Sequence, residues 1–275
     1  MCDILDHKVV NSIRSQLIQH IRNKEDDVKP MFYTVGGSHV HGFADSNSDI
    51  DIRGFHCADG NRYMLFDTPQ SQIQFSTEEF LNNTETEVVS HELRTFGTRL
   101  TNYQFNEIEA IFSNSVILTR YPNSISSLQS ILLEALPGAL PNRYYGMAQS
   151  LHDQYIHPNA PDHGDVTVKH HLYSLRGVLA AQYVSENHDV EPNLLRLSKS
   201  ILDDDGQRIV ERLIELKRTR DTESDEFEIE AKSEDLIHGL LAKNYSTEIS
   251  DDERNNFQND VADWMLEFRK QTNTL

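Results

Sequence analysis

The residues best suited to chemistry lie close together, in the segment VGGSHVHGFADSNSDIDIRG at residues 35–54. Gly37 and Ser38 follow an apolar run, and glycine lets a backbone approach a phosphate closely while a serine hydroxyl donates to it. Asp49 and Asp51 are two residues apart, so on a strand both carboxylates point to one face. Paired hard oxygens suit Mg²⁺, which binds through a few carboxylates and substrate phosphates. The segment therefore predicts a site for a metal-bound phosphate compound.

This segment resembles the nucleotidyltransferase superfamily of the DNA-polymerase-β type. In that superfamily a Gly-Ser turn after the first strand holds a nucleoside triphosphate, and the D-x-D supplies two metal ligands. The resemblance is closer to a branch associated with RNA repair, through SDIDIRGF, EVVSHELRTF, NEIEAIFSN and KHHLYSLRGVLAAQYV, although NEIEAIFSN lacks a proline typical of that branch. The similarity extends over roughly residues 30–185.

The resemblance implies a Mg²⁺-dependent enzyme that moves a nucleoside monophosphate from a triphosphate to an acceptor hydroxyl, with release of pyrophosphate. Two Mg²⁺ ions about 3.5–4 Å apart are typical of such sites. Asp49 and Asp51 would hold both ions, and Gly37, Ser38 and Arg53 would bind the nucleotide. The acceptor implied by the branch is an RNA end, such as that of a tRNA.

The resemblance also implies a third carboxylate from a later strand, directly before a helix. Glu87 lies on a predicted strand at Thr86–Val89, directly before a predicted helix, and is the favoured metal ligand and proton acceptor. Glu85 lies on the same face two residues upstream and remains the competing choice. Glu92 and Glu109 also match acidic positions of the branch, but they fall on predicted helices.

Cations for the triphosphate are expected from the C-terminal half. Lys169, Tyr173 and Arg176 fall at i, i+4 and i+7, so they share one face of a predicted helix. By resemblance they bind the nucleotide, with lysine and arginine on its phosphates.

These residues need a small sheet to carry them and helices to support it. The pattern predicts an α+β fold, with a mixed-sheet nucleotidyltransferase core at residues 1–120 and a helical domain closing the cleft at 121–275. Strands are expected at Met31–Val35, Asp49–Phe55, Gln72–Phe75 and Thr86–Val89. Helices are expected at residues 4–22, from His91, and at Asn106–Phe112, Ile125–Leu136, Asn142–Ile156, Val166–Val184, Leu194–Lys199, Arg208–Thr219 and Asp251–Lys270, with a solvated spacer at Asp221–Glu230.

Composition limits the partners. The net charge is -19 and the pI about 5.0, which disfavours non-specific binding to nucleic acid or membranes at ordinary salt. No apolar run approaches the ~18 residues of a membrane helix, and the N-terminus lacks signal-peptide features, so we expect a cytoplasmic protein without a membrane partner. Cys2 and Cys57 give neither a zinc motif nor a disulfide framework.

Three other functions remain open from the sequence. The chain could transfer AMP to a protein hydroxyl or be a toxin of that class that acts on tRNA. It could instead transfer a nucleotide to a small acceptor, as aminoglycoside-type nucleotidyltransferases do. It could also be a non-catalytic relic that binds nucleotide, although an intact pair of aspartates argues against degeneration. The motif encodes neither the acceptor nor the choice of triphosphate.

Arginine outnumbers lysine, 16 to 9, in this acidic chain, and acidity with few lysines suits a protein adapted to concentrated salt. The melting temperature should then rise between low salt and molar KCl, because the Debye length falls to ~3 Å at 1 M and self-repulsion is screened. Thermal unfolding followed by circular dichroism across KCl concentrations tests this. A melting temperature that stays flat or falls identifies an ordinary acidic protein instead.

Overall fold

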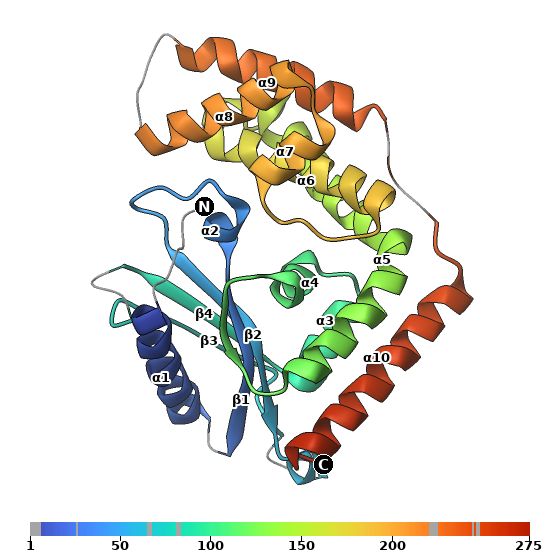
Figure 1. Ribbon diagram of the computed structural model, residues 1–275. Helices are drawn as coiled ribbons and strands as arrows, with labels where there is room; N and C mark the ends of the chain where they lie inside the picture. The colour runs from blue at the N-terminus through green and yellow to red at the C-terminus, as the bar shows by residue number, and fades with distance from the viewer. Residues whose placement is uncertain are drawn as a thin grey trace. The chain divides into compact units, whose positions relative to one another are not determined.

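The computed structural model describes residues 7–25, 27–64, 68–80, 84–219, 225–243, 245 and 248–275 (Figure 1). The chain forms two compact units. The first comprises Met1–His39, Asn47–Leu132 and Ser250–Leu275, and the second comprises Val40–Ser46 and Leu133–Ile249.

A five-stranded mixed sheet forms the framework of the first unit. Its strands are β1 (Val28–Gly36), β2 (Ile50–Ala58), β3 (Gln72–Thr77), β4 (Thr86–Glu92) and β5 (Val116–Thr119). Their order is β3-β4-β2-β1-β5, with β2 and β4 parallel and the other neighbours antiparallel. The predicted α+β class with a small mixed sheet is confirmed.

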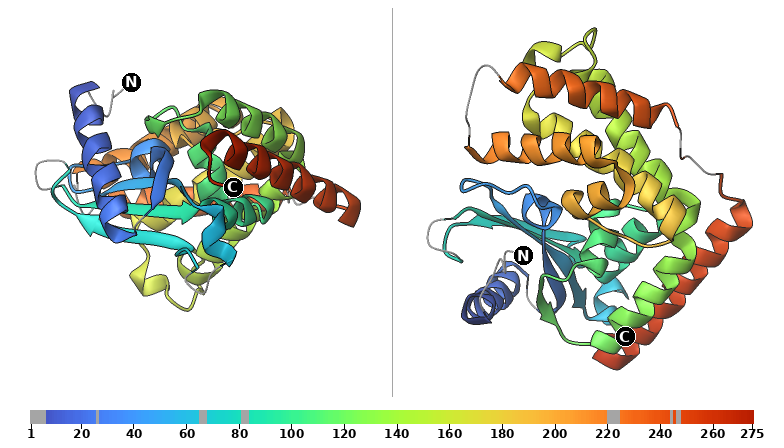
Figure 2. Two further views of the ribbon diagram at one scale, coloured as in Figure 1. Left: turned by 90° about the horizontal axis from the view of Figure 1, so that it is seen from below. Right: turned by 45° about the horizontal axis from the view of Figure 1, so that its top comes forward.

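Helices cover both faces of this sheet (Figures 1 and 2). On one face lies α1 (His7–Lys24), which buries Ile13, Leu17 and Ile21. The other face carries α3 (Leu93–Thr101), α4 (Phe105–Phe112) and α10 (Asp251–Thr272). On this second face Phe55 of β2 packs against Phe96 of α3 and Phe268 of α10, with ring centroids 4.7 and 5.5 Å away.

The second unit is helical. Its α6 (Val168–Asn187) is buried along most of its length and packs against α7 (Leu194–Ile201), α8 (Asp204–Thr219) and α9 (Asp225–Leu241). Ser233 of α9 hydrogen-bonds the buried His171 of α6. Short helical turns elsewhere in the chain are η1 (Gly60–Met64), η2 (His152–Ile156) and η3 (His163–Asp165).

One long helix, α5 (Pro122–Leu151), replaces the two helices predicted at Ile125–Leu136 and Asn142–Ile156. Prolines at 137 and 141 lie inside it, where a break is normally expected. Burial compensates, because a stripe at every fourth position is fully buried: Leu128, Leu132, Leu136, Leu140, Tyr144 and Ala148. Despite this length, no described helix is both long and apolar enough to span a membrane.

Two further expectations differ from the structure. Strand β5 was not predicted, because four residues, VILT, carry too little pattern. The spacer predicted at Asp221–Glu230 is helical from Asp225 onward, since the buried Ile237 and Leu240 fix α9 in the core of its unit. Residues 221–224 of that spacer, and residues 4–6 of the first predicted helix, lie outside the described residues.

The division into units also differs from the expected boundary at residues 120 and 121. The first unit continues to Leu132 and includes the C-terminal Ser250–Leu275. The reason is that α10 packs with the sheet unit: the Trp264 indole lies 6.2 Å from the Phe55 ring, and its Nε1 donates to the Ser124 carbonyl at 2.8 Å.

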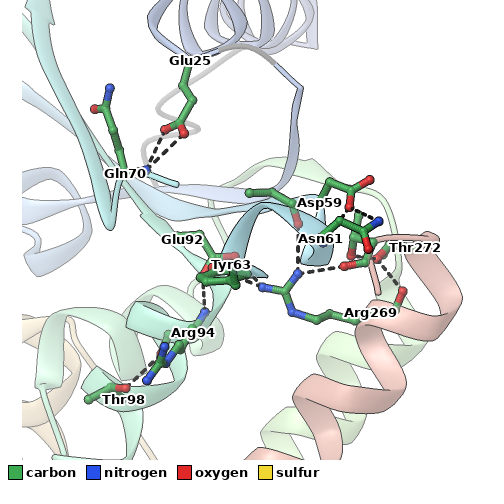
Figure 3. A network of polar contacts seen from close by, with 12 residues as sticks. Glu25, Asp59, Asn61, Tyr63, Gln70, Glu92, Arg94, Thr98, Arg269 and Thr272 are labelled. Atoms are coloured by element: carbon green, nitrogen blue, oxygen red, sulfur yellow. Dashed lines mark hydrogen bonds and ion pairs between the residues drawn. The ribbon is translucent and has the colours of Figure 1, made fainter. Parts of the chain in front are cut away.

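A buried ion pair ties α10 to the sheet (Figure 3). Glu92 ends β4 and caps α3, because its Oε2 accepts the Arg94 amide at 2.7 Å. Its Oε1 accepts Arg269 Nη2 of α10 at 2.6 Å, and Arg269 Nη1 also donates to the carbonyls of Ala58 and Thr274, at 2.9 Å each. One carboxylate thus joins β4, α3 and α10.

Replacement of Arg269 by methionine should cost about 3–5 kcal/mol of unfolding free energy, because it leaves the buried Glu92 charge without its partner. The matched control is Lys270→Met, whose side chain is exposed and pairs with Glu267 one turn away. That change should stay within about 0.5 kcal/mol. Urea denaturation of both variants measures the difference, and equal midpoints would contradict this role for Arg269.

Candidate active site

Two carboxylates face each other across the parallel strands β2 and β4. The register pairs Asp51 with Glu87, so both side chains leave the same face of the sheet. Both are partly buried, with side chains 25 % and 31 % exposed. This pairing selects Glu87, rather than Glu85, as the acid opposite Asp51.

Arg53 lies between these carboxylates. It follows Asp51 by two residues on β2 and therefore shares its face. A single atom, Arg53 Nη2, donates to Asp51 Oδ1 at 2.6 Å and to Glu87 Oε2 at 2.7 Å. The second oxygen of Glu87 accepts Nε2 of Gln74 from β3 at 2.7 Å.

The environments of the two acids push their pKa values apart. Burial raises the pKa of Asp51, the nearby Glu87 charge adds to this, and Arg53 only partly offsets it. Burial would also raise the pKa of Glu87, but the contacts with Arg53 and Gln74 outweigh it, so this pKa is lowered. Glu87 is thereby held in its charged form.

The Gly-Ser turn begins where β1 ends, next to Asp51. Gly36 of β1 pairs with Asp51, and Gly37 follows with φ +61°, a left-handed conformation that favours glycine. A Cβ on Gly37 would lie 1.8 Å from Asp51 Oδ2, so the backbone approaches the carboxylate as closely as glycine allows. Ser38 continues into the short helix α2 (Gly37–His41) and is 9 % exposed.

Asp49 lies outside this contact. It precedes the first residue of β2, Ile50, and is exposed. Glu85 likewise precedes β4 and is exposed, with its carbonyl accepting the Ile50 amide at 2.9 Å. Within the part of the chain that the structure describes, no group of three or more His, Cys, Asp or Glu side chains is placed to hold a metal ion.

Asp51 and Glu87 nevertheless fit a divalent cation. Their oxygens Oδ1 and Oε2 already share one positively charged nitrogen, so they are close enough to share one cation. Carboxylate oxygens are the donors that Mg²⁺ prefers. A metal bound there would have to displace the Arg53 guanidinium.

Of the other acids, Glu92 is committed to Arg269 and to the cap of α3. Glu109 is buried within α4. Gln74 was not predicted, since the register of β3 on β4 brings it to Glu87 and the sequence gives no signal for that register.

The remaining predicted residues lie in the second unit, gathered on α6. The ring of Tyr173 has Lys169 Nζ at 5.8 Å and Arg176 Cζ at 5.9 Å from its centroid. Lys169 is exposed, whereas Arg176 is fully buried and also lies over the Tyr144 ring. The structure thus brings these three side chains together on one helix face.

A mixed sheet with paired carboxylates beside a Gly-Ser turn is the arrangement of a polymerase-β-type nucleotidyltransferase. Comparison of the sequence with known families agrees. Residues 10–266 match the RlaP family, described as the RNA repair pathway DNA polymerase beta family. The chain belongs to this family and is a nucleotidyltransferase of the polymerase-β type.

No curated protein is significantly similar to the chain in sequence. Among solved structures, a nucleotidyltransferase-like protein from Exiguobacterium sibiricum 255-15 is similar over 94 % of this chain and 80 % of its own. The identity is 11 % and the TM-score 0.27, which is too low to say more about the fold or the site.

Substitution of Gly37 by alanine should damage the site. The left-handed conformation alone costs about 1–2 kcal/mol for a residue with a Cβ, and the added atom would displace Asp51. We expect a lower unfolding midpoint together with lost transfer activity. The control Gly146→Ala, where an added Cβ meets nothing within 4 Å, should be neutral or stabilising by up to about 1 kcal/mol. Full activity in the Gly37 variant would separate this turn from the site.

Proposed function

We propose that the chain is a Mg²⁺-dependent enzyme that transfers a nucleoside monophosphate from a nucleoside triphosphate to the hydroxyl of an RNA end. The observation that carries the proposal is the contact of Asp51 and Glu87 with one Arg53 nitrogen, next to the glycine backbone of the turn. Two carboxylates converging on one cation match the needs of metal-bound phosphoryl transfer. Membership of an RNA repair family supports RNA as the acceptor.

In this proposal Asp49, Asp51 and Glu87 hold the metal. When bound, Mg²⁺ would neutralise charge that develops on the reacting phosphate and lower the pKa of the attacking hydroxyl. Asp51 and Glu87 are already placed to share a cation, whereas Asp49 would join them from its exposed position before β2. Two ions are expected from the resemblance.

Arg53 has two roles in succession. Without a metal it neutralises the facing carboxylates, which otherwise repel each other. If Asp51 and Glu87 were to hold a metal, the Arg53 guanidinium would no longer be paired with them, and its planar fork would suit a phosphate of the nucleotide. Gly37 and Ser38 would bind the same nucleotide through the turn.

The reaction itself forms one bond and breaks one. The acceptor oxygen attacks the α-phosphorus, the bond from that phosphorus to the bridging oxygen breaks, and pyrophosphate leaves. The hydroxyl proton passes to Glu87. The lowered pKa of Glu87 makes it a weak base, so proton transfer to it requires an acceptor hydroxyl whose own pKa a bound metal would lower.

A nucleotide-binding role for Lys169, Tyr173 and Arg176 is proposed from the resemblance. Lys169 is the exposed cation among them and suits a phosphate as a point charge. Buried Arg176 is better suited to hold Tyr173 in place, since its Cζ lies 5.8 Å from the Tyr144 ring centroid and 5.9 Å from that of Tyr173.

Asp51→Asn and Glu87→Gln should each lower the rate of transfer at least about 10²-fold, which is the loss in kcat typical of removing one group that stabilises charge in the transition state. The fold should survive, because loss of one charge relieves repulsion in the pair. The matched control is Glu85→Gln, an exposed acid outside strand β4, which should keep full activity. Transfer of radiolabelled nucleotide measures all three. Loss of activity in the Glu85 variant, with activity retained in the Glu87 variant, would reverse the assignment.

The acceptor is tested by incubation of the protein with each labelled triphosphate, Mg²⁺, and either total RNA or total protein. Label in RNA supports the proposal. Label confined to protein identifies the AMP-transferase alternative, and no label in either fraction favours a small acceptor or a non-catalytic domain. The same assay repeated at increasing KCl concentrations shows whether this acidic protein needs high salt in order to label RNA.

A further inference from the structure

The segment that continues the Gly-Ser turn is held by the second unit. Helix α2 runs from Gly37 to His41, and the chain passes into the second unit between His39 and Val40. The segment Val40–Ser46 therefore belongs to the same compact body as α6, α7 and α8.

Two neighbouring cations of α8 bind three consecutive carbonyls of this segment. Lys217 Nζ donates to the Phe43 carbonyl at 2.8 Å. Arg218 donates on either side of it, from Nη2 to the Gly42 carbonyl at 3.0 Å and from Nε to the Ala44 carbonyl at 3.2 Å. A backbone bound at three successive residues has little freedom left.

Packing fixes the side chains of the same segment. Phe43 is fully buried, with its ring 5.1 Å from the Tyr173 ring and 5.1 Å from Lys217 Nζ. The His41 ring lies 5.7 Å from Tyr173. The segment is therefore held by aromatic contacts from α6 as well as by hydrogen bonds from α8.

The start of the segment is fixed from α7. Asn193, the N-cap of α7, donates from Nδ2 to the Val40 carbonyl at 3.3 Å. Gly42 has φ +85°, and a Cβ there would lie 2.5 Å from the same Nδ2. The second unit thus holds residues 40–44 from three helices.

The choice of residues points to a purpose beyond loop packing. This chain has only nine lysines and a net charge of -19, yet two adjacent cations here donate to three backbone carbonyls of one short segment, and the Asp45 charge of that segment also acts on Lys217. Burial lowers the pKa of Lys217, so the arrangement has a cost. A loop that only had to cover the core could use an apolar contact such as Phe43 alone.

We propose that Lys217 and Arg218 are positioning residues for the phosphate-binding turn. By fixing residues 42–44 they set where α2 ends, and the covalent chain transmits this to Gly37 and Ser38, which then present their backbone to a triphosphate without further ordering. The inference rests on the proposed function of that turn. Pre-ordering of a binding segment strengthens binding because less conformational entropy is lost on association.

The test compares Lys217→Met, Arg218→Gln and the double variant with wild type, using the full chain. Calorimetric titration with ATP, GTP, CTP and UTP in turn, each with Mg²⁺, gives Kd. Hydrogen exchange of residues 40–46 and thermal unfolding are followed in parallel. Arg208→Gln is the matched control, since Arg208 lies on the same helix, is exposed, and hydrogen-bonds Asp204 and Asp205 among the described residues.

We expect faster exchange in residues 40–46 and a Kd raised roughly tenfold in each single variant, as for the loss of about 1.4 kcal/mol. Melting temperatures should stay near that of wild type, Arg208→Gln should change nothing, and Lys217→Arg should restore much of the affinity. A purely structural clamp would speed exchange and leave Kd unchanged, which would overturn the inference.

Failure of the two proposals can be told apart. Wild type that binds a triphosphate but transfers no label overturns the proposed function alone. Wild type that transfers label, with variants of unchanged Kd, overturns the positioning role alone, and no triphosphate binding by wild type overturns both. If Lys217→Met does not fold, Arg218→Gln decides the question, because it keeps the Lys217 contact with Phe43.

Discussion

The site depends on one pairing, that of β2 with β4 as parallel neighbours in the register that sets Asp51 opposite Glu87. A shift of one residue would turn one carboxylate to the opposite face, because side chains alternate along a strand. The register is held from both sides of the sheet. Phe55 packs on α3 and α10 on the face of the acids, while Tyr33, Ser90 and His56 are buried and hydrogen-bonded on the other. Glu92, at the end of β4, fixes that strand to α10 through Arg269.

This pairing explains why Arg53 stands where it does. Two partly buried carboxylates side by side repel each other and would favour protonation. Arg53, at the next position on the same face, offers one nitrogen to both and holds Glu87 charged. Arg53 thus keeps the two carboxylates in a cation-binding geometry in the absence of metal. A metal would have to displace its guanidinium in order to bind there. The Gly37 backbone completes it, since any side chain there would occupy the space of the Asp51 carboxylate.

The sequence was most informative where chemistry and local pattern coincide. Three features could be predicted because each has a short-range signature in the sequence. They are the Gly-Ser turn, strand β2 with its alternating pattern, and strand β4 directly before α3. Glu87 could be favoured over Glu85 only by resemblance, and its contact with Asp51 required the strand order. Gln74, Lys217 and Arg218 carry no local signal, because their roles arise from contacts between elements distant in the chain. The long α5 was predicted as two helices because its prolines argue against continuity, whereas its buried stripe outweighs them.

The excess of arginine over lysine has a structural use in such an acidic chain. Where cations are few, each must satisfy several acceptors, and the planar guanidinium presents five donors in a fixed fork. Arg53 bridges two carboxylates, Arg218 reaches two carbonyls, and Arg269 joins Glu92 to the backbone of β2 and of the C-terminal segment. Arg218 and Arg269 use two different nitrogens for their acceptors, which the single nitrogen of a lysine could not do, whereas Arg53 reaches both carboxylates from Nη2 alone. The use of arginine thus meets the demands of these multiple contacts as well as any advantage in salt. The two causes separate experimentally at Arg53 and Arg269, since their partly buried contacts are screened far less by salt than exposed charges are.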